Sequence, residues 1–435
     1  MHRHNPAAAA GTDPWSLVAV PAWEAARAGV SASLAVTDVA WTPATGAHGA
    51  RIWVTVVDLL GAGLTGLWVS TDNGATFVQV PLPGMPPAPR RFAIGSHPNH
   101  PDTLYVLSSG PTLWRIDGTL APPGAGPQPV ANLPGALFGA NDISFYAIAA
   151  AVDPANNARV MVGGAAVTSP IDAATAPSAS FAAAMYLLTV APAGPPGTFA
   201  TDYAMPADAG PNDPTWVGSE VHADVHRIVW EAPAGVNQVW VGCDGGVYRS
   251  LRGGALGSYA ATSSGMAVSE PGFLANHPVS PGPVLAGMQD NGTQLRIGSS
   301  VWRSAVRNGD SGGVAFDPGT PGRFIAQTFG SRWTEDGGQD VTPTFRLTFN
   351  AGSAFLLEDA QAAFYSYATV TRTAAGTPVT RLAVGTDRVW LTERWGQSRW
   401  DGAVWRREWV TLPTATDPRA GDAAPPAAAN ALAQD

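Results

Sequence analysis

Short apolar runs with alternating polar residues recur along the chain and predict β-strands. The run 226–242 (HRIVWEAPAGVNQVWVG) consists of an apolar strand, a small turn containing a proline and a second apolar strand. Alternation with a period of two favours strands over helices, because successive side chains of a strand point to opposite faces. The same unit occurs at 36–56, 91–107, 146–164, 226–242, 272–287 and 312–327, with a proline-free seventh copy at 380–393.

Each copy is followed by another strand, a turn and a strand, so the repeating unit holds four strands. The prolines of the turns, from Pro43 to Pro318, are on average about 55 residues apart. This period is too long for a β-helix rung and too regular for β-sandwiches, and it is typical of a propeller blade. We therefore predict an all-β fold, a seven-bladed β-propeller with four-stranded antiparallel blades. The expected boundaries are a flexible N-terminus at 1–14, the propeller at 15–413 and a disordered Ala/Pro-rich tail at 414–435.

Composition and charge exclude several functions. Only 13% of the 435 residues are charged and the formal net charge is −9, which argues against binding of nucleic acid. The sequence holds no lysine, so Schiff-base chemistry and a P-loop are excluded. A single cysteine, Cys243, rules out an internal disulfide framework. With no apolar stretch that would span a membrane and no visible secretion signal, we expect a soluble monomer, cytoplasmic or exported by a non-classical route.

Two groups of motifs resemble a known family. Residues 70–77 (STDNGATF) match the Asp-box, or BNR, pattern Ser-x-Asp-x-Gly-x-Thr-Trp/Phe. Residues 219–330 (HADVH, CDGG, MQDNG and NGDSGG) resemble bacterial Asp-box propellers related to sortilin-type and xyloglucanase-type proteins. The resemblance implies a propeller of the sialidase-like superfamily. It leaves the activity open, because sialidases, xyloglucanases, sorting receptors and assembly factors share this box.

Propeller topology separates the two Asp-Asn-Gly triplets of the chain. In a blade with strands A to D, loops B–C and D–A emerge on one face and loops A–B and C–D on the other. The box at 70–77 follows a third strand, so we interpret it as a C–D turn in which Asp72 accepts local N–H groups. The triplet in 287–294 (GMQDNGTQ) follows a second strand and lies in a B–C loop. The same face is expected to carry the loops 219–226 (SEVHADVH), 242–246 (GCDGG) and 307–313 (RNGDSGG).

The histidines of this face are spaced by two residues. If the segment is extended, His222, Asp224 and His226 project on the same side. They could then hold a divalent metal ion, contact a polar substrate, or hydrogen-bond to neighbouring loops. Cys243 could add a soft ligand, although a cysteine that ends an apolar strand is more often buried.

The carboxylates of the same face are candidates for catalysis. Glycoside hydrolysis requires paired carboxylic groups, one acid and one base or nucleophile. We assign these roles to Asp224, Asp290 and Asp310, although each Asp-Gly or Asn-Gly pair is also explained by turn chemistry alone. The candidates for substrate binding are His222, His226, Asp244, Gln289, Asn291 and Asn308. The positions just before the inner strands are mostly acidic, which suits a cation or sugar hydroxyls; they are Asp38, Arg91, Asp142, Glu270 and Arg381.

These patterns favour a glycan-directed propeller, a glycosidase-like hydrolase that acts at one mouth of the central channel. Two alternatives stay open. One is a non-catalytic propeller that binds a protein or peptide at the same face, and the other is a metal-dependent enzyme that uses His222, Asp224 and His226. The partners expected are a carbohydrate or a peptide, and the only cofactor considered is a divalent metal ion. The aromatic cluster at 394–409 either packs between blades or stacks against sugar rings.

Overall fold

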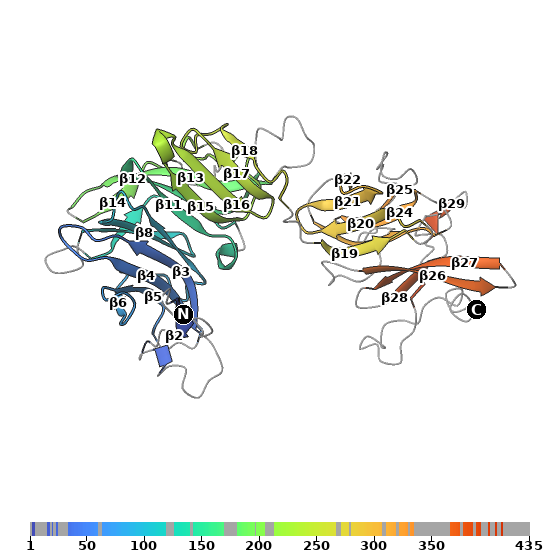
Figure 1. Cartoon of the computed structure of the whole chain (residues 1–435), viewed down its shortest axis with the longest axis horizontal. Helices are drawn as coiled ribbons and strands as arrows, with labels where there is room; N and C mark the ends of the chain where they lie inside the picture. Colours follow the sequence, from blue (N-terminus) through green and yellow to red (C-terminus); the bar gives the residue numbers. More distant parts are fainter. Residues whose placement is uncertain are drawn as a thin grey trace, which may run out of the picture. The chain divides into compact units, whose positions relative to one another are not determined.

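The computed structural model divides the chain into two compact units, Met1–Met266 and Ala267–Asp435 (Figure 1). The described residues are 2–4, 15–17, 20, 23–24, 34–59, 63–118, 126–139, 142–168, 181–195, 197–204, 213–266, 271–277, 280–306, 310–318, 322–328, 331–334, 366–374, 377–385, 389–392, 399–400, 405–406 and 410–411. The tail expected at 414–435 lies outside them.

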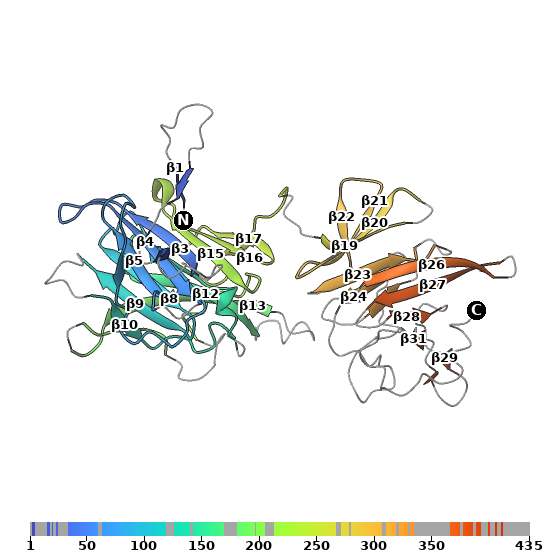
Figure 2. The same ribbon diagram turned by 90° about the horizontal axis from the view of Figure 1, so that it is seen from below.

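The first unit contains four successive antiparallel meanders of four strands each within its described residues. The first is β3 (Leu34–Thr42), β4 (Arg51–Asp58), β5 (Gly66–Ser70) and β6 (Val78–Val80). The second is β7 (Phe92–Ser96), β8 (Thr103–Ser108), β9 (Thr112–Asp117) and β10 (Gln128–Ala131). The third is β11 (Ala149–Asp153), β12 (Asn156–Thr168), β13 (Phe181–Pro192) and β14 (Phe199–Thr201). The fourth is β15 (Val225–Glu231), β16 (Gln238–Cys243), β17 (Gly246–Ser250) and β18 (Tyr259–Ala261) (Figure 2). The prediction of an all-β fold with four-stranded antiparallel sheets is confirmed.

The second and third meanders differ from the predicted separate blades, because they join into one eight-stranded sheet. Their outermost strands, β10 and β14, pair in parallel with Val130 opposite Phe199 and Ala131 opposite Ala200. Both strands are short, and each would otherwise leave one row of backbone N–H and C=O groups unpaired at a sheet edge. The parallel pair satisfies part of both edges at once.

Successive sheets of the first unit pack face to face. Trp53 of β4 and Trp114 of β9 belong to the core between the first two meanders. Tyr105 and Tyr186 belong to the core between the second and third, and Trp230 of β15 to the core between the third and fourth. A sheet covered on both faces needs continuous apolar strands rather than alternating ones. Accordingly, every residue of β5, β8 and β11 is buried.

The first strands of successive sheets also lie side by side. Strand β3 packs against β7, β7 against β11, and β11 against β15. Two of them carry a β-bulge near the start, between Val36 and Asp38 in β3 and between Val225 and Arg227 in β15. A bulge changes the direction in which its side chains point. Thr37 and His226 are the extra residues of these two bulges.

The second unit repeats this arrangement. One four-stranded antiparallel sheet consists of β19 (Pro271–Asn276), β20 (Pro283–Met288), β21 (Gly292–Ile297) and β22 (Trp302–Val306). It is followed by the three described strands β23 (Ser311–Phe316), β24 (Phe324–Thr328) and β25 (Ser331–Thr334). A further four-stranded sheet holds β26 (Ser366–Ala374), β27 (Thr377–Gly385), β28 (Val389–Thr392) and β31 (Val410–Thr411). First strands again lie side by side, since β23 packs against both β19 and β26.

Two short pairs complete the strands of the described residues. They are β1 (His2–His4) with β2 (Trp15–Leu17), and β29 (Arg399–Trp400) with β30 (Trp405–Arg406). Within the part of the chain that the structure describes, no helix has the length and apolar character needed to cross a bilayer.

Candidate functional site

The turn at 70–77 is held together by hydrogen bonds between its own residues. It connects the third strand of its sheet, β5, to the fourth, β6, as predicted. The carboxylate of Asp72 accepts from the N–H of Thr76 at 2.8 Å, from its hydroxyl at 2.6 Å and from the hydroxyl of Ser70 at 2.8 Å. The hydrogen bonds to Thr76 and Ser70 lower the pKa of Asp72 from 3.8 to about 2. Gly74 takes the left-handed conformation of the turn (φ 83°), and Phe77 is buried behind it. All these hydrogen bonds are internal to the turn, so the carboxylate of Asp72 serves to stabilise the turn.

The first unit carries two of the four predicted polar loops, 219–226 and 242–246. His226 is the bulged residue at the start of β15, and Asp244 lies in the turn after β16, the second strand of the same sheet. The bulge directs the His226 ring toward this turn, where Nε2 hydrogen-bonds to Asp244 Oδ1. The other ring nitrogen, Nδ1, lies 3.2 Å from the carbonyl oxygen of Tyr146. His226 therefore links the fourth sheet to the loop before the third.

Tyr146 completes this link. It follows the short 3-10 helix η1 (Ile143–Phe145) and precedes β11, and its hydroxyl donates to Asp244 with oxygen distances of 3.0 and 2.9 Å. Its ring meets the His226 ring edge to face with centroids 4.7 Å apart. Even so, Tyr146 and Phe145 remain 42% and 53% exposed, an unusual state for two adjacent aromatic side chains. They offer an aromatic surface beside the carboxylate. We call residues 142–146, 222–227 and 244–245, together with Asp38 and Arg91, the rim.

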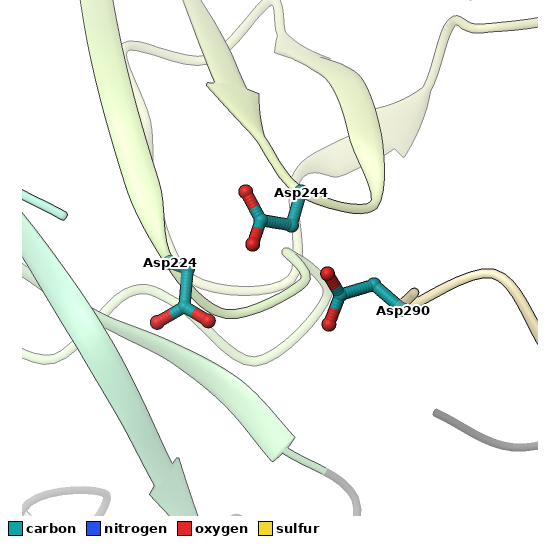
Figure 3. A group of neighbouring side chains, drawn as sticks. All are labelled: Asp224, Asp244 and Asp290. Carbon is teal, nitrogen blue, oxygen red and sulfur yellow. The ribbon is translucent and has the colours of Figure 1, made fainter. Parts of the chain in front are cut away.

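Two carboxylates meet at the rim. Figure 3 shows Asp224 just before β15 and Asp244 in the turn after β16, and one oxygen of each lies within 4.8 Å of the other. Asp224 has a left-handed backbone (φ 64°), which is uncommon outside glycine and often occurs at functional sites. The condition that 222–226 is extended, under which the three side chains would project on the same side, is therefore not met at Asp224. The segment becomes a strand only from Val225 onward.

His222 packs directly beneath the Asp244 turn. A Cβ added to Gly245 would lie 2.4 Å from the Cβ of His222, so only glycine allows the turn to rest on this histidine. The ring Nδ1 of His222 lies 3.2 Å from the carbonyl oxygen of Ala223. Metal binding by His222, Asp224 and His226 stays a prediction. In this geometry both ring nitrogens of His226 already face oxygen atoms.

Asp38 lies in β3, the first strand of its sheet, and Arg91 directly precedes β7. Asp38 accepts from the N–H of Ile94 at 2.7 Å and lies 3.4 Å from the guanidinium of Arg227. Arg91 Nη1 donates to the carbonyl oxygen of Tyr146 at 2.8 Å. Side chains from four successive sheets thus meet at one rim of the first unit.

Cys243 ends β16 beside this turn. Burial raises the pKa of its thiol from 9.0 to about 12, so the thiol is protonated at neutral pH. A metal ligand or nucleophile would need the thiolate. The structure thus favours the interpretation of Cys243 as a packing residue, partly buried against the core between the third and fourth meanders.

The remaining predicted residues belong to the second unit. Gln289, Asp290 and Asn291 form the turn between β20 and β21, the second and third strands of their sheet, as predicted. Asp290 has a left-handed backbone (φ 61°), and its N–H donates to Asp310 Oδ1 at 3.2 Å. Gln289 and Asn291 are exposed. Asn308 and Glu270 lie outside the described residues, and so do most residues of the aromatic cluster at 394–409.

Sequence reasoning missed the residues that link neighbouring sheets. Tyr146 and Arg227 carry no motif, and they reach Asp244 and Asp38, respectively, on other sheets. Phe145 carries no motif either and lies next to Tyr146. The one available signal was the adjacent aromatic pair Phe145–Tyr146 after Asp142, just before a predicted inner strand. Asp142 caps η1 by accepting from the N–H of Ser144.

Comparisons with known proteins give partial matches. No family model matches the chain, and no curated protein matches it. Among solved structures, a GH74 enzyme from Niastella koreensis matches with 14% identity and a TM-score of 0.32, over 85% of this chain and 61% of that one. The chain thus spans less than two thirds of that enzyme.

Two further structures are YCF48 proteins. One is described as YCF48 bound to D1 peptide, with 12% identity and a TM-score of 0.27 over 67% of this chain and 74% of that one. The other, YCF48 from Cyanidioschyzon merolae, has 13% identity and a TM-score of 0.26 over 63% and 73%. These identities and TM-scores are too low to support an argument about this chain. The fold is therefore described from the strand pairing of the chain itself.

Proposed function

We propose that the protein is a seven-bladed β-propeller of the Asp-box class that binds a glycan at the rim and hydrolyses a glycosidic bond there. Seven groups of strands follow one another in the described residues, and they start with β3, β7, β11, β15, β19, β23 and β26. The groups that start with β7 and β11 share one eight-stranded sheet. First strands lie side by side within each unit, as the inner strands of a propeller do. The internally bonded turn at 70–77 supports the Asp-box assignment.

The observation that carries the proposed activity is the carboxylate pair at the rim. Asp224 and Asp244 bring oxygens within 4.8 Å of one another, and retaining glycosidases place their two carboxyl groups about 5 to 5.5 Å apart. Tyr146 and His226 hold Asp244 from two directions. A fixed carboxylate suits a nucleophile, and the partly buried Asp224 suits the acid that protonates the leaving group. Asp290 and Asp310 of the second unit remain further candidates for these roles.

Two exposed rings support a carbohydrate as the ligand. Phe145 and Tyr146 are adjacent and both exposed, and the hydroxyl of Tyr146 donates to Asp244. Together they present exposed aromatic surface and a hydroxyl group. Pyranose rings have an apolar face of C–H groups and a polar periphery, which such a surface complements. His222, His226 and Asp244 are the proposed substrate contacts at the rim. Gln289, Asn291 and Asn308 belong to the second unit and stay candidates for substrate binding there.

The test is a screen of aryl glycosides and polysaccharides with the wild type and four variants. Asp224→Asn, Asp244→Asn, Asp290→Asn and Asp310→Asn each keep the size of the side chain and remove its proton-transfer or nucleophilic capacity. We expect Asp244→Asn and Asp224→Asn to lower kcat by at least about a hundredfold. Asp72→Asn is the matched control, since its carboxylate is confined to the 70–77 turn. Turnover that persists in all four variants would refute the assignment, and absence of turnover in the wild type would refute the hydrolase.

A second candidate, a metal-dependent enzyme, rests on the same carboxylate pair. Two oxygens within 4.8 Å of one another suit a hard divalent cation. Metal analysis of the purified protein tests it: bound metal at one equivalent that is lost in His222→Ala/His226→Ala would support the predicted ligands. A peptide that binds at the rim without any turnover would instead identify a recognition propeller.

A further inference from the structure

A small cavity opens at the rim of the first unit. It has a volume of about 130 Å³ and is lined by the first strands of all four sheets. Asp38 comes from β3, Arg91 from the residue before β7, Ala150 from β11, and His226 and Arg227 from β15. A space of this size admits one small chemical group of a larger ligand rather than a whole molecule.

The negative charge of the cavity is already bound by donors. Asp38 Oδ2 accepts from the N–H of Ile94 at 2.7 Å, and Oδ1 accepts from the N–H of Val39 at 2.8 Å. Arg227 lies 3.4 Å from the same Oδ1. The carboxylate of Asp244, outside the cavity, receives the His226 ring and the Tyr146 hydroxyl. Asp38 and Asp244 thus have fixed partners.

The positive charge is not balanced in the same way. Arg91 donates to a backbone carbonyl, that of Tyr146, and no carboxylate of the described residues forms an ion pair with it. Arg227 keeps 62% of its side chain exposed and reaches Asp38 only at the long distance of 3.4 Å. A guanidinium carries five N–H donors, so one hydrogen bond leaves most of its capacity for a ligand. Two arginines therefore face one acidic residue across a partly enclosed space.

We propose that this cavity binds a carboxylate group of the ligand, with Arg91 as the main contact and Arg227 as the second. Guanidinium and carboxylate are planar and match in a pair of parallel hydrogen bonds, which favours this anion over a neutral hydroxyl. Given the proposed glycan-directed function, the carboxylate is that of a uronic acid unit. This differs from the cation or sugar hydroxyls expected from the acidic residues alone, because Asp38 in the cavity is already paired with donors of the fold.

The test uses D-glucuronate, with D-glucose as the neutral control, titrated into the full chain and followed by calorimetry. We expect saturable binding of glucuronate, no binding of glucose at equal concentration, and affinity that falls with added salt. Arg91→Gln should weaken glucuronate binding at least about tenfold, and Arg91→Lys should restore only part of it. Arg252→Gln makes the same charge change on an exposed loop of the first unit and should leave the affinity unchanged.

Other outcomes overturn the inference separately from the proposed function. Equal affinity for glucuronate and glucose, no binding of either sugar, or an Arg91→Gln variant that folds and binds as the wild type does, refutes the carboxylate site. If Arg91→Gln does not fold, Arg227→Gln and the salt dependence decide the question instead. Turnover of neutral glycosides without glucuronate binding refutes the site alone, whereas glucuronate binding without any turnover refutes the hydrolase alone. A peptide that binds with a free but not an amidated C-terminus assigns the carboxylate to a peptide and overturns the uronate.

Discussion

The hydroxyl of Tyr146 donates to Asp244, 98 residues later in the chain, with distances of 3.0 and 2.9 Å to the two carboxylate oxygens. Tyr146 belongs to the loop before the third sheet and Asp244 to the fourth sheet. The His226 ring lies against both. This contact fixes the position of a carboxylate that we place in the proposed chemistry.

We expect Tyr146 and Asp244 to contribute to stability in an energetically coupled way. Tyr146→Phe keeps the ring and removes one hydrogen bond, and Asp244→Asn weakens the same bond from the other side. Each change should lower the free energy of unfolding, and their effects should differ from additivity by about 1 kcal/mol. Urea unfolding of the two single variants and the double variant measures this coupling. Asp102→Asn combined with Tyr146→Phe is the control pair and should be additive. Additivity in both pairs would show that the contact contributes nothing.

Gly287 is expected to be indispensable for the packing of the second unit. A Cβ at this position of β20 would lie 1.9 Å from the carbonyl oxygen of Gly312 in β23, and backbone at that distance cannot yield as a flexible side chain does. Gly287→Ala should therefore destabilise the protein by about 1 to 3 kcal/mol. Gly272, in β19 of the same sheet, meets nothing within 4 Å, and Gly272→Ala should change stability by less than about 0.5 kcal/mol. Equal unfolding midpoints for the two variants would contradict the close packing of the two sheets.

Asp72 should make stability depend on pH in the acid range. Its folded-state pKa is lowered to about 2 from 3.8, so its charged form is favoured by folding. The contribution is fully present above about pH 4 and is lost as the pH falls from about 4 to about 2. Asp72→Asn should therefore flatten the dependence of the unfolding free energy on pH within this window. Unfolding curves of wild type and variant at several acid pH values provide the measurement, and identical slopes would show that the turn does not retain its bonds.

Cys243 should react with alkylating agents only after unfolding. Its pKa of about 12, raised by burial, leaves almost no thiolate at pH 8, and the thiolate is the reacting species. We expect iodoacetamide to modify the native protein at least about a hundredfold more slowly than the urea-unfolded protein. Mass spectrometry over time measures both rates. Comparable rates at pH 8 would mean that the thiol is accessible and activated.

The sequence was most informative about the order of strands. The repeat positions predicted which strand precedes each loop, and this separated the turn of Asp72, after a third strand, from that of Asp290, after a second strand. The strand order confirms both positions. Period-two alternation and proline-marked turns are local signals, and the antiparallel meanders that they predict form between neighbours in the chain.

Contacts between sheets could not be predicted in this way. The parallel pair of β10 with β14, and the hydrogen bond of Tyr146 with Asp244, join residues that share no motif. The left-handed backbone of Asp224 was also missed, because Asp and Asn only tolerate this conformation more readily than other residues and do not require it. The bulge that directs His226 toward Asp244 has no signature in its own sequence. Some residues of the rim, such as His226 and Asp244, could therefore be predicted from the sequence. The hydrogen bonds that they form could not.

The parallel pair of β10 and β14 has a consequence for how this chain can change in evolution. A repeat array gains or loses members when a unit is duplicated or deleted, and this is tolerated where each unit meets its neighbours only through side-chain packing. The second and third sheets share backbone hydrogen bonds as well, through Val130 with Phe199 and Ala131 with Ala200. Removing either sheet, or inserting another between them, would leave a strand edge exposed. We therefore expect variation in the number of repeats among descendants of this chain to occur elsewhere, with these two sheets inherited as one unit.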